Sequence, residues 1–160
     1  MFHILIVCTG NTCRSPMAEG LLRKMLATEG IDDVKVSSAG IGTLDGYPAT
    51  SFGVRAAAEK DVDISHHHST RMTSALAAEA DLILTMADNH FEYVSGMDSA
   101  EGKLYMLKGF PEAGHSDYLH SVKDPVGGTL DEYRRTIDEL ERELLRILPH
   151  LKQRIEAART

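Results

Sequence analysis

The stretch from Cys8 to Ser15 reads Cys-Thr-Gly-Asn-Thr-Cys-Arg-Ser and brings a thiol, a glycine and an arginine into one short segment. Ahead of a helix, the backbone N–H groups of such a loop can surround one phosphate-sized anion. Arg14 lies six positions after Cys8 and can hold two phosphate oxygens with its planar guanidinium. The positive end of the helix is expected to lower the pKa of the Cys8 thiol. The Ser15 hydroxyl can donate a hydrogen bond to the resulting thiolate. The segment therefore predicts a thiol nucleophile inside a phosphate-binding loop.

The residues between Cys8 and Arg14 are expected to line the bound phosphate; they are Thr9, Gly10, Asn11, Thr12 and Cys13. A cysteine that ends a strand is more often a small buried hydrophobe, and Cys-x5-Arg alone is a weak signal. The pattern Gly-x4-Gly-Lys-Ser/Thr is absent, which excludes a nucleotide P-loop. Cys13 is either a packing residue of the loop or a thiol that can form a disulfide with Cys8 under oxidation.

The sequence predicts a strand before this loop and a helix after it. Phe2 to Val7 is an apolar run interrupted only by His3, as in a strand buried on both faces of a parallel sheet. Cys8 is thereby placed at the carboxyl end of the strand, where open α/β sheets bind ligands. Ser15-Pro16 indicates a helix start. The helix continues through apolar residues at helical spacing, namely Met17, Ala18, Leu21, Leu22 and Met25.

Strand and helix patterns alternate through the rest of the chain, which is typical of a parallel α/β domain. Further strands are predicted at 34–39, 81–86 and 103–107, and further helices at 51–59, 73–80 and 89–94. We therefore expect an α/β fold that forms a single domain over residues 1–160. It would have three α/β/α layers and a four-stranded, parallel, doubly wound sheet, with the phosphate-binding loop after strand one.

A capping box formed by Thr129 and Glu132 opens the last predicted helix. Its apolar residues recur at alternating spacings of three and four, which favours a stripe that covers one face of the sheet over a dimer seam. The stripe consists of Leu130, Tyr133, Ile137, Leu140, Leu144, Ile147, Leu151 and Ile155. Pro149 is expected to break or kink this helix near Leu148.

Composition narrows the possible partners. With 17 basic and 24 acidic residues the formal charge is −7, which argues against a general nucleic-acid binder. The apolar run at the N-terminus is too short for a signal or membrane segment, so a cytoplasmic protein that binds no membrane is expected. Two cysteines make neither a disulfide framework nor a four-ligand zinc site. The consecutive residues His66, His67 and His68 do not converge on one ion in a regular element, so a solvated run is favoured and no metal or cofactor is expected.

Displacement of a phosphoryl group by a thiolate leaves a group that needs a proton, so a general acid should face the loop. Asp124 is the best candidate, because it lies just ahead of the last predicted helix and Pro125 stiffens the backbone beside it. The residues around it, 108–128, form a long segment rich in Gly, Pro, Asp and His, and long loops in compact domains tend to be functional. Asp-Pro is also an ordinary turn signal.

Over essentially all of its 160 residues, the chain resembles the low-molecular-weight protein tyrosine phosphatases, and four stretches carry the resemblance. These stretches are Cys8 to Pro16, Ser38-Ala39-Gly40, Asp81 to Met86 and Asp124-Pro125. The resemblance implies a protein phosphatase that needs no metal and acts on a phosphorylated protein, with inorganic phosphate or another oxyanion in the loop.

The resemblance also implies a role for each matching residue. Cys8 would attack phosphorus and become phosphocysteine, Arg14 would hold the phosphoryl oxygens and Ser15 would assist the thiolate. Asp124 would protonate the leaving group and then activate water. Asn11 would brace the loop with support from a histidine before the third helix. Counting back from that helix selects His67, with His66 and His68 beside it as alternatives.

Two departures from the phosphotyrosine-directed members concern the substrate. Those members typically flank the pocket with aromatic residues, where this chain has Leu44 and Val126-Gly127-Gly128, and Tyr47 is a poor match. The usual Ile or Val between Asn11 and Cys13 is Thr12, whose hydroxyl can meet a polar guanidinium. Asn11-Thr12-Cys13 together with Asp124-Pro125-x-Gly127-Gly128 is similar to the bacterial protein arginine phosphatase branch of this family. This similarity favours phosphoarginine, with phosphotyrosine as the alternative if Thr12 only substitutes for Ile in shape.

Two other functions compete with a phosphatase. Arsenate reductases of this fold need further cysteines downstream, and the chain has none after Cys13. A non-catalytic phosphate-binding module would have no use for both Cys8 and Asp124. Hydrolysis is therefore the favoured interpretation.

Overall fold

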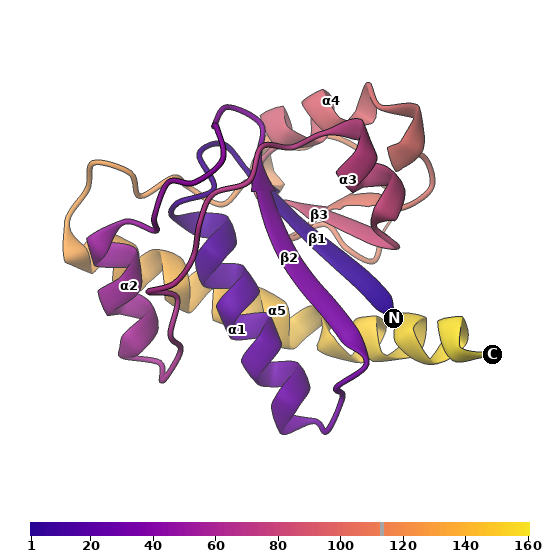
Figure 1. Cartoon of the computed structure of the whole chain (residues 1–160), viewed down its shortest axis with the longest axis horizontal. Coiled ribbons are helices and arrows are strands. Elements are labelled where there is room, and N and C mark those ends of the chain that lie inside the picture. Colours follow the sequence, from indigo (N-terminus) through magenta and orange to yellow (C-terminus); the bar gives the residue numbers. More distant parts are fainter. Residues whose placement is uncertain (113) are drawn as a thin grey trace.

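The computed structural model describes residues 1–112 and 114–160, which form a parallel sheet covered by helices on both faces (Figure 1). The sheet contains β1 (Phe2–Cys8), β2 (Val34–Gly40), β3 (Leu82–Thr85) and β4 (Leu104–Met106), in the spatial order β2-β1-β3-β4. All three pairs of neighbouring strands are parallel. The predicted strands therefore all form, each within two residues of its expected ends.

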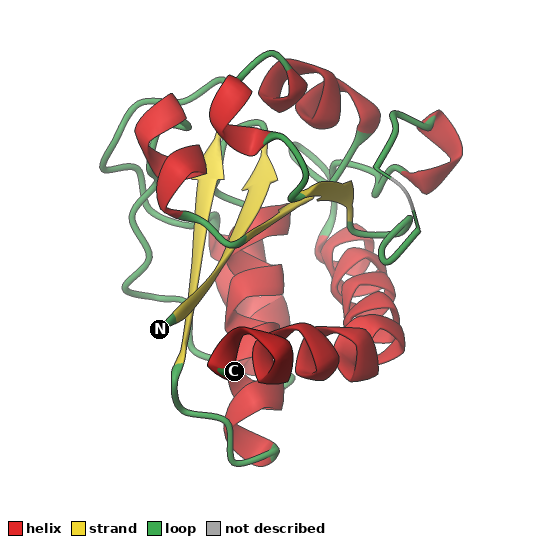
Figure 2. Ribbon diagram, turned by 90° about the vertical axis from the view of Figure 1, so that its right-hand side faces the viewer, coloured by secondary structure: helices red, strands yellow, loops and turns green. Residues whose placement is uncertain are grey.

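Side chains of β1 point alternately to the two faces of the sheet. Ile4 and Ile6 belong to the core beneath α1 (Arg14–Thr28), α2 (Ser51–Ala58) and α5 (Leu130–Arg159). Leu5 and Val7 belong to a second core beneath α3 (Ser74–Glu79) and α4 (Asp88–Ser95). Figure 2, turned by a right angle from Figure 1, shows the helices on either side of the strands. Two short 3-10 helices, Asp98–Ala100 and Tyr118–His120, complete the structure. The predicted three-layer α/β/α architecture is confirmed.

The sheet places the ends of three strands along one edge. Cys8 at the end of β1 pairs with Gly40 of β2, and Val7 pairs with Thr85 of β3. Because β1 connects to β2 on one side and is flanked by β3 on the other, strand order reverses at this position, where open α/β sheets bind ligands. The loops after these three strands can therefore contribute to one site.

Helix α1 begins at Arg14, two residues before Pro16. Proline is tolerated there because the first four N–H groups of a helix have no partner within it. Arg14 and Ser15 thus belong to the first helical turn, and their side chains have fixed directions relative to the loop.

The expected break at Pro149 is wrong, because α5 continues through it to Arg159. Pro149 cannot donate to the carbonyl of Leu145, and both residues are exposed, so the missing hydrogen bond lies on the solvent side of the helix. The opposite side carries the predicted apolar stripe, whose members from Tyr133 to Ile155 are buried. Packing of this stripe holds the helix together across the proline.

In the described part of the chain, no helix combines the length and apolar character needed to span a bilayer.

Candidate active site

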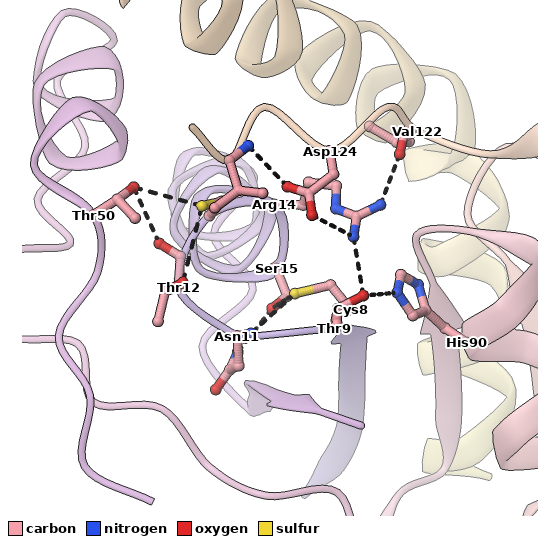
Figure 3. A network of polar contacts seen from close by, with 12 residues as sticks. Cys8, Thr9, Asn11, Thr12, Arg14, Ser15, Thr50, His90, Val122 and Asp124 are labelled. Atoms are coloured by element: carbon pink, nitrogen blue, oxygen red, sulfur yellow. Dashed lines mark hydrogen bonds and ion pairs between the residues drawn. The ribbon is translucent and has the colours of Figure 1, made fainter. Parts of the chain in front are cut away.

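The Cys8 sulfur lies at the centre of the loop that follows β1 (Figure 3). Its Sγ is 2.8 Å from the Ser15 hydroxyl oxygen and accepts a hydrogen bond from the Asn11 N–H at 3.3 Å. Asn11 has φ = 56°, a left-handed conformation that turns its N–H inward towards the sulfur. The loop therefore aims donors at the position of the predicted nucleophile.

The expectation of a lowered pKa for Cys8 is wrong for this loop. Burial raises the pKa of the Cys8 thiol, because the residue is only 2% exposed. The Ser15 hydroxyl, the charge of Arg14 and the Asn11 N–H act in the opposite direction without overcoming burial. These same groups stabilise the thiolate form of Cys8.

Asn11 is the brace of the loop. Its side-chain amide donates to the hydroxyl of Ser15 at 2.7 Å and to that of Ser38 on β2 at 2.9 Å, and its oxygen accepts from the N–H of Thr70 at 2.8 Å. Of the three neighbouring histidines, it is His67 whose ring contacts the loop, with Nε2 2.6 Å from the Asn11 carbonyl oxygen. These bonds hold the left-handed residue in place from two directions.

The Ser38-Ala39-Gly40 stretch fits against this loop through its glycine. A Cβ atom on Gly40 would lie 2.5 Å from the carbonyl oxygen of Thr9 and 3.0 Å from the Cβ of Asn11. Only a residue without a side chain allows β2 to approach the loop this closely. The glycine at the end of this stretch thus has a steric cause.

Arg14 is anchored by both of its terminal nitrogens. Its NH1 donates to the Val122 carbonyl oxygen at 2.8 Å, and its NH2 donates to the Thr9 hydroxyl at 3.3 Å. The same NH2 lies 3.4 Å from Oδ2 of Asp124, whose Oδ1 accepts from the N–H of Val126 at 3.0 Å. The structure thereby brings Asp124 beside the loop from a distant part of the chain, with its carboxyl more than one-third exposed.

Thr12 and Cys13 connect the loop to the start of α2 and to α5. The Thr12 carbonyl accepts from the N–H of Thr50, which leads into α2, at 2.9 Å. The Sγ of Cys13 is 3.3 Å from the Tyr133 hydroxyl and 3.6 Å from that of Thr50. Burial raises the pKa of Tyr133 to about 12, so this hydroxyl keeps its proton and can donate. Both Cys8 and Cys13 are free thiols in the structure.

Four residues of the site were absent from the sequence-based prediction; they are Thr50, His90, Val122 and Tyr133. Thr50, Val122 and Tyr133 contact residues of the loop or Arg14 through long-range contacts, which no local sequence pattern predicts. His90 had a usable signal, because it follows β3 at the same edge of the sheet as Cys8.

In the part of the chain that the structure describes, no group of three or more His, Cys, Asp or Glu side chains is arranged to hold a metal ion.

Three residues considered above as flanks of the pocket are exposed. Leu44, Tyr47 and Val126 are all more than half exposed. Phe52 packs its ring edge against Tyr133, with ring centres 5.8 Å apart.

Comparison with known proteins identifies the family of the chain. Residues 3–157 match the low molecular weight phosphotyrosine protein phosphatases. The chain belongs to that family. It is therefore a cysteine-dependent protein phosphatase, as the sequence predicted.

Relatives within the family differ in their named substrates. The protein-arginine-phosphatase of Bacillus subtilis is 39% identical over 151 residues, 94% of this chain and 97% of the relative. The low molecular weight protein-tyrosine-phosphatase Etp of Escherichia coli is 34% identical over 140 residues, 87% of each. A solved structure of YwlE arginine phosphatase superposes with a TM-score of 0.84 at 38% identity, covering 94% of this chain and 96% of that one. In that structure a serine replaces the active-site cysteine and is phosphorylated.

Proposed function

We propose that this protein removes phosphoryl groups from phosphoarginine in proteins, with Cys8 as the nucleophile. The Cys8 thiolate attacks phosphorus while the phosphorus–nitrogen bond breaks, and Asp124 gives its proton to the departing guanidine nitrogen. The phosphoryl group is then carried as phosphocysteine. Asp124, now a carboxylate, takes a proton from water, which attacks phosphorus and releases inorganic phosphate and the thiolate.

The positions of the side chains support these roles. Sγ of Cys8 lies beside the Ser15 hydroxyl, which can donate to the thiolate both before attack and when it leaves. Arg14 reaches the loop with its guanidinium and still has protons free, because its three anchoring contacts use three of the five that a guanidinium carries. Asn11 and His67 keep the loop in its anion-binding shape.

Thr12 is the observation that carries the choice of phosphoarginine. Its side chain is half-buried in the loop, and its hydroxyl lies 3.9 Å from the Cys13 sulfur, too far for a strong hydrogen bond. This hydroxyl is thus available to a polar guanidinium, where an Ile side chain would offer only apolar contact to a phenyl ring. The 39% identity to a protein-arginine-phosphatase points the same way.

Phosphotyrosine is the second candidate. Exposed rings of Tyr47 and Phe52 are present in the segments after β2, and a phenyl ring could pack on either. The 34% identity to Etp adds to this case. The same Cys8 and Asp124 chemistry would serve a phenol leaving group.

The experiment that separates the two candidates compares variants of Thr12 on matched peptides that carry phosphoarginine or phosphotyrosine. Thr12→Val keeps the shape and removes the hydroxyl, whereas Thr12→Ser keeps the hydroxyl and removes the methyl group. We expect wild type and Thr12→Ser to prefer phosphoarginine, and Thr12→Val and Thr12→Ile to shift towards phosphotyrosine. Equal preferences in all four proteins would refute the assignment.

The catalytic roles have a separate test that uses an aryl phosphate. Cys8→Ser should abolish hydrolysis while phosphate binding persists, because the donors of the loop remain. Asp124→Asn should slow formation of phosphocysteine most strongly for poor leaving groups. Normal turnover by Cys8→Ser would remove the proposed nucleophile. The two free thiols of this loop fit a reducing compartment such as the cytoplasm.

A further inference from the structure

His90 is a fully buried histidine that reaches the phosphate-binding loop from the opposite face of the sheet. It belongs to α4, and its Nε2 lies 2.8 Å from the hydroxyl oxygen of Thr9 (Figure 3). Its Nδ1 is buried and has no hydrogen-bond partner among the described residues. An unpaired buried polar atom is destabilising, so packing alone would be served better by an apolar side chain.

The surroundings of His90 keep its ring neutral. Burial, followed by the charge of Arg14, lowers the pKa of His90 to about 3, and Asp88 acts in the opposite direction. A neutral imidazole has one N–H and one lone pair, so Nε2 can either donate to the Thr9 hydroxyl or accept from it. In both tautomers this bond fixes the position of the hydroxyl oxygen.

The Thr9 hydroxyl is also a partner of Arg14, because it accepts from NH2 at 3.3 Å. The other two anchors of the guanidinium are the Val122 carbonyl and the Asp124 carboxylate, and both come from the same loop ahead of α5. That loop carries the group that must exchange protons with the leaving group and with water. The His90–Thr9 pair therefore supplies the anchor that does not depend on Asp124.

We infer that His90 is a positioning residue that holds the Thr9 hydroxyl in place, and through it the plane in which the Arg14 guanidinium meets the phosphoryl oxygens. The inference rests on the proposed role of Arg14 but is independent of the choice between phosphoarginine and phosphotyrosine. It assigns His90 no contact with the substrate.

The test uses three variants of the full chain. His90→Leu removes the ring nitrogens, Thr9→Val removes the hydroxyl without changing the shape, and His90→Gln restores a polar group that can reach Thr9. The measurements are the affinity for inorganic phosphate, kcat and KM with an aryl phosphate, and the melting temperature. The loss of one hydrogen bond of ordinary strength corresponds to about a three- to tenfold change in an equilibrium constant.

We expect His90→Leu and Thr9→Val each to weaken phosphate binding and to lower kcat/KM by about three- to tenfold. The double variant should be no worse than either single one, since both changes remove the same anchor. His90→Gln should recover most of the loss. His3→Leu is the matched control, because His3 is also buried and bonds the Ser37 hydroxyl, but far from the loop; it should leave phosphate affinity unchanged.

Unchanged phosphate affinity and kcat/KM in both His90→Leu and Thr9→Val would overturn the inference, whatever happens to the melting temperature. Additive losses in the double variant would do the same. If His90→Leu fails to fold, Thr9→Val and His90→Gln still decide the question. Arg14→Lys separates this failure from that of the proposed function: if it binds phosphate as tightly as wild type, it is the role of Arg14 itself that fails.

Discussion

Replacement of His90 by glutamine should make the protein less sensitive to acid. The ring is neutral in the folded protein because burial and the charge of Arg14 lower its pKa to about 3. In the unfolded chain the ring is in water, with a pKa of about 6.5. Between these two pH values the His90 ring is protonated in the unfolded state and neutral in the folded state. The unfolded state is therefore increasingly favoured as the pH falls.

The size of the effect follows from the difference between the two pKa values. Full stability is present above about pH 6.5 and is lost at about 1.4 kcal/mol per pH unit below it, until the pH approaches 3. At about pH 5 the loss from His90 amounts to about 2 kcal/mol. His90→Gln carries no titrating group at this position and should be spared this part of the loss.

The assay is urea unfolding of wild type and His90→Gln at about pH 7.5 and about pH 5, with the free energy of unfolding taken at each. Wild type should lose about 2 kcal/mol more than the variant between the two conditions. His66→Gln is the matched control, because this histidine is exposed and meets water in both states; it should behave as wild type. Equal losses in wild type and His90→Gln would refute the argument that the site keeps His90 neutral.

Two further predictions concern the support of the loop. Gly40→Ala should destabilise the protein by about 1–3 kcal/mol and lower kcat/KM, because the new Cβ would lie 2.5 Å from the Thr9 carbonyl oxygen; thermal unfolding and kinetics check it against Gly96→Ala, whose Cβ would meet only ordinary contacts. His67→Leu should lower kcat/KM by about three- to tenfold, because the Asn11 carbonyl loses its partner. The same change at exposed His68 should have no effect, and equal kinetics in the two variants would contradict the assignment of His67.

The sequence was sufficient for the sheet and the phosphate-binding loop because both depend on local patterns. The apolar run of β1 indicated where the strand ends, and the helix-start signal at Ser15-Pro16 indicated where the loop closes, one residue after the observed start of α1 at Arg14. The capping box at Thr129 and Glu132 is present as predicted. The placement of Asp124 came from chemistry and resemblance, and the structure brings it to 3.4 Å from Arg14.

The residues that were missed depend on contacts between distant segments. Thr50 and Tyr133 meet the loop only after α2 and α5 have packed. Val122 meets Arg14 only after its segment has bonded to Met86, which follows β3. The pKa of Cys8 was predicted in the wrong direction because burial depends on tertiary packing and outweighs the local donors. Pro149 was predicted to break α5 because proline removes a helical hydrogen bond. The prediction is wrong because packing of the apolar face, which local sequence does not reveal, stabilises the helix across the proline.

The most direct test of the account is to follow the phosphoryl group of a radiolabelled phosphoarginine protein during a single turnover. We predict that rapid quenching with denaturant at alkaline pH, which spares the acid-labile phosphorus–nitrogen bond of the substrate, will trap the label on wild-type enzyme, within the peptide that contains Cys8, and that the label will leave as inorganic phosphate at the rate of turnover. Cys8→Ala should carry no label. Release of labelled phosphate by wild type with no labelled enzyme at any time, or with label on another residue, would contradict attack by Cys8 on phosphoarginine.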